Sequence, residues 1–195
     1  MSDQPNNETH ERILDAAEQL FAVRGYAAVT LRDIGNAVGM KHASLYYYAP
    51  EGKKQLYREV MLRTFRRHRA GLDAAIAGAG DQFQAQIYAV VRWLVSQPPL
   101  DLTHMAQSDM HALGETDAAE LMAVAFNTFR APLVGVLRRA KHRQLISVDD
   151  LSLAALALVT LIQSLQNVPG IASTEDRERL GLSLADMLLN GWLVR

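Results

Sequence analysis

The 195-residue chain contains no cysteine. Disulfide bonds and thiolate metal sites are therefore excluded, and nothing in the composition argues for an oxidising compartment. The first eight residues, MSDQPNNE, are polar and acidic, whereas a signal peptide needs a basic start and an apolar stretch. The longest apolar run, Leu151 to Ile162, is interrupted by Ser152 and Thr160 and is too short to span a bilayer. We therefore expect a soluble, cytoplasmic protein.

Basic residues do not exceed acidic ones overall, but they are unevenly placed. The formal net charge is −1, yet residues 24–69 hold ten Lys and Arg against three Asp and Glu. The flanking stretches, 1–23 and 70–195, are both acidic. A local basic excess is the footprint of a phosphate-binding surface, which gains affinity by releasing counterions. The alternative, the solvated face of a helix, applies to Arg63, Arg66, Arg67 and Arg69.

The apolar pattern predicts an all-α fold of about nine helices, because no segment shows the alternation typical of a strand. The expected helices cover about residues 9–23, 30–38, 41–48, 50–78, 81–96, 101–114, 117–142, 147–166 and 173–192. Gly25 should close the first helix, and Pro132 should kink the seventh. The last two helices have capping-box-like starts, Ser147 with Asp150 and Ser173 with Asp176.

Residues 30–48, TLRDIGNAVGMKHASLYYY, are the most informative segment. Thr30 can cap a short helix, and Asp33 can reach back toward that cap. Gly39 stands where this helix should stop, because glycine tolerates the left-handed backbone that ends a helix. Small and polar residues then restart the chain, and Leu45 anchors a second short helix inward. Two helices joined by so tight a turn are a helix-turn-helix, whose second helix enters the major groove of DNA.

Residues 12–60 resemble the DNA-binding domain of the tetracycline-repressor-like (TetR) family of bacterial transcription regulators. Several pieces recur in order and at the right separations: Ile13-Leu14-Asp15-Ala16-Ala17, Leu20-Phe21, Arg24-Gly25-Tyr26, Thr30-Leu31-Arg32-Asp33-Ile34, Ala37-Val38-Gly39 and Ser44-Leu45-Tyr46-Tyr47. The resemblance implies a ligand-responsive regulator, most often a repressor, that binds a palindromic operator in double-stranded DNA as a homodimer. It also implies a disordered tail over 1–8, a three-helix DNA-binding domain over 9–49, and an effector-binding and dimerisation domain over 50–195.

The resemblance further implies which side chains touch DNA. Arg32 lies where the family often contacts the groove, and its planar fork suits guanine O6 and N7. Thr30 is a phosphate contact by position, because free backbone N–H groups point outward at a helix N-terminus. Lys53 matches the family's phosphate-gripping lysine. The contacts expected from the second motif helix are Lys41, His42, Ala43, Ser44, Tyr46 and Tyr47.

Two departures from the family pattern leave alternatives open. Ala49 stands where the family commonly has phenylalanine, and Tyr48 could compensate in the core. The segment that follows is one residue longer than the commonest form, so Lys54 could take the role of Lys53. His42 could also be only an exposed polar residue.

The region after the motif is rich in methionine, leucine and aromatic residues. A helical enzyme is the alternative class, but the sequence has no glycine-rich phosphate loop, no nucleophile motif and no paired carboxylates at matched spacing. We expect instead a pocket for a small apolar or amphipathic effector that favours the DNA-releasing state. An ordinary core, in a TetR-like DNA-binding protein with no effector, is the other alternative. The lining residues we expect are Trp93, Met105, Met110, His111, Met122, Phe126 and Phe129.

Metal binding is not expected, and neither is any cofactor. His104 and His111 fall on one face of the sixth expected helix, with Asp101 one turn before His104. Histidine and carboxylate are common metal ligands, but this spacing is not a known ligand pattern. A polar group that orients an effector, or plain surface histidines, are the alternatives.

The last two helices are expected to form a subunit interface. The segment LSLAALALVTLIQSLQ is apolar almost all round, so it must be buried on more than one side. One helix-turn-helix reads only half of a palindrome, so a two-fold dimer suits such a site. The alternative is that both helices only complete the core of one chain. The interface residues we expect are Leu151, Ala155, Leu158, Ile162, Leu184, Leu188 and Trp192.

Overall fold

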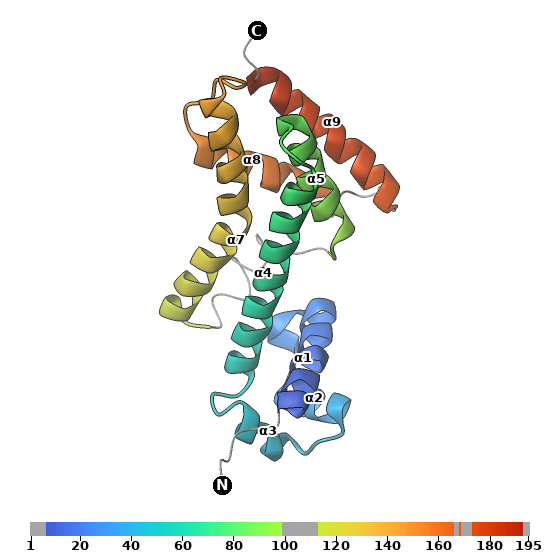
Figure 1. The fold of residues 1–195 in the computed structure, drawn as a ribbon. Coiled ribbons are helices and arrows are strands. Elements are labelled where there is room, and N and C mark those ends of the chain that lie inside the picture. The colour runs from blue at the N-terminus through green and yellow to red at the C-terminus, as the bar shows by residue number, and fades with distance from the viewer. Residues whose placement is uncertain (1–6, 99–112, 166–167, 169–172, 193–195) are drawn as a thin grey trace. The chain divides into compact units, whose positions relative to one another are not determined.

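The computed structural model describes residues 7–98, 113–165, 168 and 173–192. Within them the chain forms eight α-helices, which confirms the all-α prediction. The helices are α1 (Asn7–Ala28), α2 (Leu31–Val38), α3 (His42–Tyr48), α4 (Lys53–Gly78), α5 (Phe83–Ser96), α7 (Glu115–His142), α8 (Leu151–Ser164) and α9 (Thr174–Trp192), as Figure 1 labels them. The helix expected over 101–114 falls almost entirely outside the described residues.

The contacts between residues divide the chain into two compact units. The N-terminal unit is Met1–Phe65 with Leu102–Val124, and the C-terminal unit is Arg66–Asp101 with Ala125–Arg195. Helices α4 and α7 each contribute residues to both units. The division at residue 49/50 that the sequence suggested stays a prediction.

The N-terminal unit is built around α1, with α2, α3 and the first turns of α4 gathered about it (Figure 1). Its core holds Phe21, Tyr26 and Tyr57, whose ring centroids lie 4.8–5.9 Å apart. Leu45 and Ala49 are both fully buried, so Ala49 is a core residue at the position where the resemblance implies phenylalanine. Tyr48 is half-buried and stacks beside His10, with ring centroids 6.2 Å apart.

One arginine of α4 ties this helix to α1 through three carboxylates. The Arg63 guanidinium lies 3.1 Å from Glu11, 2.8 Å from Asp15 and 2.5 Å from Glu18. Arg63 is four-fifths buried, so this is an internal clamp and neither a free solvated charge nor a phosphate contact. Of the other arginines in the basic run, Arg69 pairs with Asp73 at 2.7 Å on the exposed side of α4.

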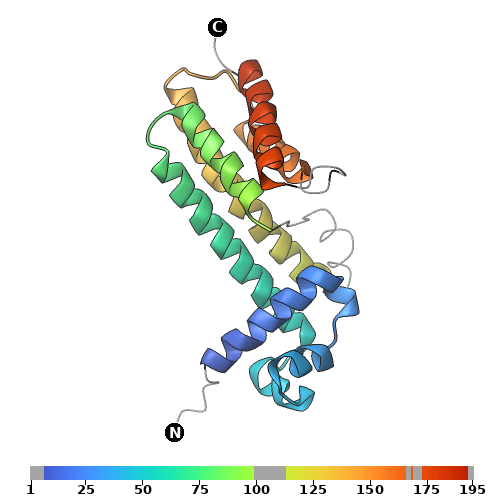
Figure 2. The same cartoon turned by 90° about the vertical axis from the view of Figure 1, so that its right-hand side faces the viewer.

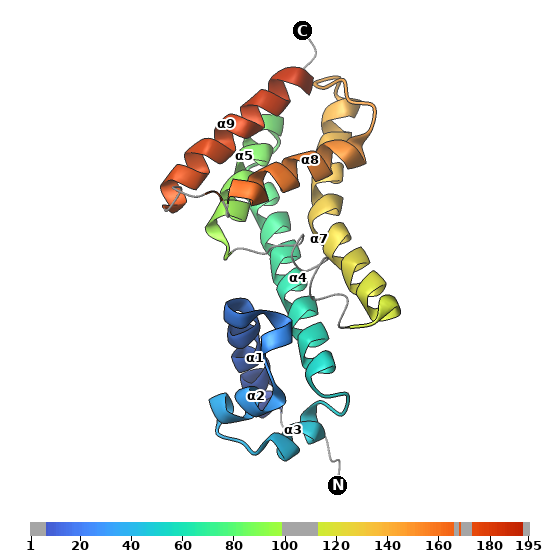
Figure 3. The same ribbon diagram turned by 180° about the vertical axis from the view of Figure 1, so that it is seen from behind.

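In the C-terminal unit, α5 turns back antiparallel to the second half of α4 (Figure 2). The Trp93 indole of α5 packs directly on the backbone of α4 at Gly71. On its other side α5 packs along α9, where Tyr88 donates a hydrogen bond to Asp186 and Arg92 pairs with Glu178 at 2.8 Å. Helix α8 contacts both α5 and α9 (Figure 3).

The helix boundaries confirm some capping predictions and correct others. Ser173 caps α9, since its hydroxyl accepts the backbone N–H of Asp176 at 3.0 Å. Ser147 was the wrong cap for α8: Asp150 itself accepts the N–H groups of Ser152 and Leu153 at 2.8 and 3.0 Å. Helix α8 begins at Leu151, so Asp150 is its cap, and Ser147 lies before the helix, where its backbone N–H donates to the carbonyl of Trp192 at 2.7 Å.

The first and fourth helices also differ from expectation at one end. Gly25 does break α1, with φ 72° and ψ 166°, but a short helical piece continues to Ala28. Helix α4 begins at Lys53 and not near Pro50, because Gly52 has φ 72° and cannot belong to a right-handed helix. Helix α7 contains Pro132 within its span and continues to His142.

Helix α7 is long and apolar enough to cross a membrane on length and composition alone. The core helices of soluble proteins meet the same criterion. Leu133, Val136 and Leu137 of α7 are at most 1% exposed inside the C-terminal unit, so a core helix accounts for this composition.

Candidate nucleic-acid interface

The start of α2 is fixed by a reciprocal capping box, as predicted. The Thr30 hydroxyl accepts the backbone N–H of Asp33 at 3.2 Å, and the Thr30 N–H donates to the Asp33 carboxylate at 2.8 Å. Hydrogen bonds from the Thr30 hydroxyl and N–H lower the pKa of Asp33, and the charges of Arg24 and Arg32 act in the same direction. Because Thr30 is engaged in its own cap, any phosphate contact here falls to the free N–H groups of the next residues.

The turn between α2 and α3 depends on two glycines. Gly39 ends α2 in the left-handed conformation, with φ 73° and ψ 27°, as the sequence indicated. Gly35 was not singled out from the sequence, yet a Cβ atom there would lie 2.7 Å from the carbonyl oxygen of Met40. That position closes the turn, since the Met40 N–H donates to the Gly35 carbonyl at 2.8 Å. A glycine inside a short, otherwise amphipathic helix was the available signal.

The first turn of α3 is presented to solvent. Lys41, His42, Ala43 and Ser44 are all exposed, while Leu45 is fully buried and anchors the helix. Tyr46 and Tyr47 of the next turn are 50% and 49% exposed. The structure therefore brings the six residues expected from this helix onto one accessible segment.

A hollow of about 500 Å³ lies where α2 meets α3, and we call it the α2–α3 groove. Its lining residues are Arg32, Asn36, Gly39, Met40, Lys41, His42 and Ala43. Arg32 is exposed and faces this groove from α2, so it shares one surface with the start of α3. Asn36 and Met40 were not predicted to belong to the site. Asn36 is exposed and Met40 half-buried, and the turn geometry, which no local sequence signal specifies, places both on the groove.

The two lysines at the start of α4 are both engaged within the N-terminal unit. The Lys53 ammonium donates to the carbonyl oxygen of Tyr26 at 2.9 Å and lies 4.1 Å from the centroid of the Tyr26 ring. Lys54 forms an ion pair with Asp117, and Arg58 lies 3.9 Å from the same carboxylate. Each lysine therefore has an internal partner in this structure, and a phosphate contact by Lys53 or Lys54 stays a prediction.

The residues expected to line an effector pocket differ in their burial, and their gathering into one pocket stays a prediction. Phe129 is 2% exposed and stacks on His68, with ring centroids 5.2 Å apart. Trp93 is half-buried, whereas Phe126 is 48% exposed and faces solvent. Met122 is half-buried in the N-terminal unit. The other candidates, Met105, Met110 and His111, lie outside the described residues, as does His104.

The residues expected at a subunit interface are buried or half-buried within this chain. Ala155, Leu158 and Ile162 are at most 1% exposed. The half-buried positions are Leu151, Leu184, Leu188 and Trp192. The apolar residues that α8 and α9 leave exposed are Leu153, Leu156, Leu161, Leu180 and Met187. The apolar pattern of α8 predicted that the helix is buried on several sides. It did not show which of these sides is buried within a single chain.

Comparison with known proteins bears on the N-terminal unit first. Residues 13–60 match the family model of bacterial regulatory proteins of the tetR family. KstR2, an HTH-type transcriptional repressor of Rhodococcus jostii, is 31% identical over 129 residues, which make up 64% of this chain and 61% of KstR2. The chain therefore matches less than two thirds of that relative's length.

Within the described residues no group of three potential metal ligands occurs.

Solved structures match nearly the whole chain. A protein from Saccharomonospora viridis, described as a transcriptional regulator and solved in complex with choline, superposes with a TM-score of 0.78 at 20% identity, covering 97% of this chain and 100% of that one. AibR, solved with isovaleryl coenzyme A and operator DNA, gives a TM-score of 0.73 at 16% identity over 90% of this chain and 97% of AibR. These identities establish the fold. The match to the tetR-family model is confined to residues 13–60, so beyond the shared fold the family likeness rests on the helix-turn-helix region of the chain.

Proposed function

We propose that this protein is a transcriptional repressor that binds a palindromic DNA operator as a homodimer and is released by a small apolar or amphipathic effector. The observation that carries the proposal is the accessible first turn of α3, beside Arg32 on the α2–α3 groove. An α-helix with small and polar residues at its start fits the major groove, where base edges are readable. Such a protein works on the chromosome, which supports a cytoplasmic location.

Different residues of this surface would contact the base edges and the phosphate backbone of DNA. Arg32 can bond guanine O6 and N7 with two N–H groups, and the Ala43 methyl can touch a thymine methyl. Lys41, His42, Ser44, Tyr46 and Tyr47 offer hydrogen bonds to base edges or phosphates. Phosphate contacts at the start of α2 come from the backbone around Thr30, and Lys53 or Lys54 supplies one from α4.

Replacing Arg32 tests the base-reading role. Arg32→Ala should weaken binding to the preferred operator by about 1–2 kcal/mol and relax preference at one base pair of each half-site. Arg66→Ala is the matched control, because Arg66 is an exposed arginine of the C-terminal unit. Fluorescence anisotropy on the operator and on single-base variants measures both effects. Equal losses on operator and random DNA would assign Arg32 to the backbone instead.

Dimerisation is proposed through the exposed apolar residues of α8 and α9. Leu153 and Met187 are 62% and 71% exposed, a large apolar area for a free surface. The half-buried Leu184 lies three residues before Met187 on α9 and extends that face, and Leu188 and Trp192 are half-buried on the same helix. A C2 dimer would present two recognition helices to the two halves of a palindrome.

The structure changes how this interface should be tested. Leu158→Glu would bury a carboxylate at a position that is 1% exposed, so it should unfold the chain and reveal little about association. Leu156→Glu is better, because Leu156 is 39% exposed. At micromolar concentration, we expect sedimentation to give the mass of a monomer for this variant. A cooperative thermal melt should show that the monomer is still folded. Val23→Glu, at an 83% exposed position of α1, should leave the dimer intact. An unchanged dimer for Leu156→Glu would move the interface elsewhere.

Effector binding is supported by two buried polar atoms of the C-terminal unit. His68 Nδ1 and Trp93 Nε1 are buried without a hydrogen-bond partner. His68 and Gly71, against which Trp93 packs, are one turn apart on α4, so both atoms border the same part of the unit. Buried polar groups are normally paired, and a bound molecule could pair these. The ligands solved with similar proteins, choline and isovaleryl coenzyme A, show that this fold accommodates small molecules. A ligand screen by thermal shift, followed by operator titration, tests this part.

A further inference from the structure

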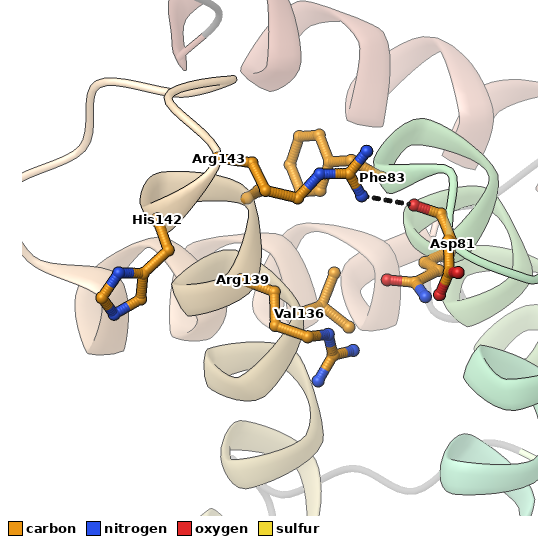
Figure 4. Close-up of a pocket in the computed structure, with 8 residues that line it drawn as sticks. Asp81, Phe83, Val136, Arg139, His142 and Arg143 are labelled. Carbon is orange, nitrogen blue, oxygen red and sulfur yellow. Dashed lines mark hydrogen bonds between the residues drawn. The ribbon is translucent and has the colours of Figure 1, made fainter.

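We propose that the C-terminal unit carries a second small-molecule site, for an amphipathic carboxylate, between the end of α7 and the start of α5. A hollow of about 360 Å³ lies there (Figure 4). It lies at the opposite end of α5 from Trp93 and includes none of the residues proposed for DNA or effector binding. The inference therefore goes beyond the proposed function.

The floor of this hollow is apolar and already formed. Phe83 of α5 is 8% exposed, and Val136 and Ala140 of α7 are 1% and 2% exposed. Val136 and Ala140 are four residues apart, so they lie one above the other on a single face of α7. A short alkyl chain could cover this floor without any rearrangement of the core.

The rim of the hollow carries positive charge. Arg139 lies on α7 next to Ala140, Arg143 directly follows the last residue of that helix, and both extend toward α5 (Figure 4). Arg143 donates from Nη1 to the backbone carbonyl of Asp81 at 2.9 Å, which fixes its guanidinium at the entrance without neutralising it. No carboxylate of the described residues lies within ion-pair distance of Arg139. The Asp81 side chain lies on the rim as the one acidic group among the lining residues.

These features select the ligand class. Two guanidinium groups against one carboxylate leave a net positive rim, and a guanidinium fork binds carboxylate through two parallel N–H bonds. Basic residues at a helix C-terminus also complement the helix dipole, which accounts for part of the run Arg138 to Arg143. Dipole complementarity does not account for an open apolar floor beside the charges. The volume is at the small end of ligand sites, which suits a short-chain amphiphile and not a large cofactor.

The test is direct binding of octanoate to the full-length protein, with octanol and octylammonium as neutral and cationic controls. Isothermal titration should detect octanoate binding, at least tenfold weaker binding of octanol, and no binding of octylammonium at the same concentrations. The double variant Arg139→Gln with Arg143→Gln should weaken octanoate binding at least tenfold. Arg138→Gln is the matched control, because Arg138 is exposed, directly precedes Arg139 and does not line the hollow. Circular dichroism melts confirm that each variant is folded.

Two results would overturn the proposal. Equal affinity for octanoate and octylammonium would mean apolar partitioning without recognition of charge. Unchanged octanoate binding in the double variant would place the ligand elsewhere, including at the proposed effector site. No DNA enters the experiment, so its outcome is independent of whether the protein is a repressor.

Discussion

Lowering the pH from 7 to 4 should reduce the unfolding free energy of the wild-type protein by about 3 kcal/mol more than that of the His68→Gln variant. His68 is 5% exposed on α4, where it stacks on Phe129, and its Nδ1 atom has no hydrogen-bond partner. Burial, helped by the nearby charge of Arg67, lowers the pKa of His68 from 6.5 to about 4. The folded protein therefore holds this imidazole neutral at pH values where the unfolded chain protonates it.

The direction of the pH effect follows from proton uptake. Above about pH 6.5 neither state binds the proton, so His68 contributes nothing to the pH dependence of stability. As the pH falls from 6.5 toward 4, the unfolded chain binds a proton that the folded chain does not. Each pH unit in that window removes about 1.4 kcal/mol of stability. The loss ends near pH 4, where the folded protein also binds the proton.

Denaturant titrations at several pH values measure this loss. Both tryptophans, Trp93 and Trp192, belong to the C-terminal unit, so their fluorescence reports the unit that contains His68. Carboxyl groups titrate alike in wild type and variant, so the difference between the two proteins isolates the histidine. His142→Gln is the control, because it replaces an exposed histidine at the end of α7 by the same residue. Parallel pH profiles for wild type and His68→Gln would contradict the prediction.

Features that depend on a few neighbouring residues could be predicted from the sequence. The Thr30–Asp33 and Ser173–Asp176 caps and the left-handed Gly39 are each specified within one helical turn. The sequence also places the exposed start of α3 correctly, because a buried Leu45 dictates which side of so short a helix faces solvent. The DNA contacts themselves remain predictions.

Features that join distant parts of the chain could not be predicted. The Lys53 ammonium contacts the backbone carbonyl and the ring of Tyr26. The sequence suggested only a phosphate contact for Lys53, because Tyr26 is distant in the chain. Arg63 in the basic run pairs with carboxylates of α1, since charge counting does not reveal partners. The hydrophobicity of α8 indicated burial, but which of its residues one chain covers depends on how α5 and α9 pack against it.

Gly71 of α4 shows the same limit, because its role depends on a tryptophan of another helix. A Cβ atom at Gly71 would lie 1.9, 2.3 and 2.4 Å from three atoms of the Trp93 indole. Real Cβ atoms essentially never approach other atoms within 3.0 Å, so the ring or the helix would have to move. An isolated glycine inside a helix pattern was visible in the sequence, but the partner that requires it was not.

Gly71→Ala should therefore destabilise the protein by about 2–3 kcal/mol, near the upper end of overpacking effects. The clash must exceed the gain of roughly 1 kcal/mol that alanine brings to a helix interior. Gly78→Ala in the same helix is the matched control, because nothing lies within 4 Å of a Cβ atom there. That variant should be unchanged or slightly more stable. Thermal melts followed by circular dichroism compare the two.

A double-variant cycle then identifies the cause of the loss. Trp93→Leu removes the ring that meets the new Cβ atom, so Gly71→Ala should cost much less in the Trp93→Leu background than in wild type. Residues in direct contact show coupling of about 0.5–3 kcal/mol, and a steric clash should fall in the upper part of that range. Additive losses would mean that Gly71→Ala acts on the α4 backbone by itself. In that case the close packing of α4 and α5 at Gly71 would not explain why this position holds glycine.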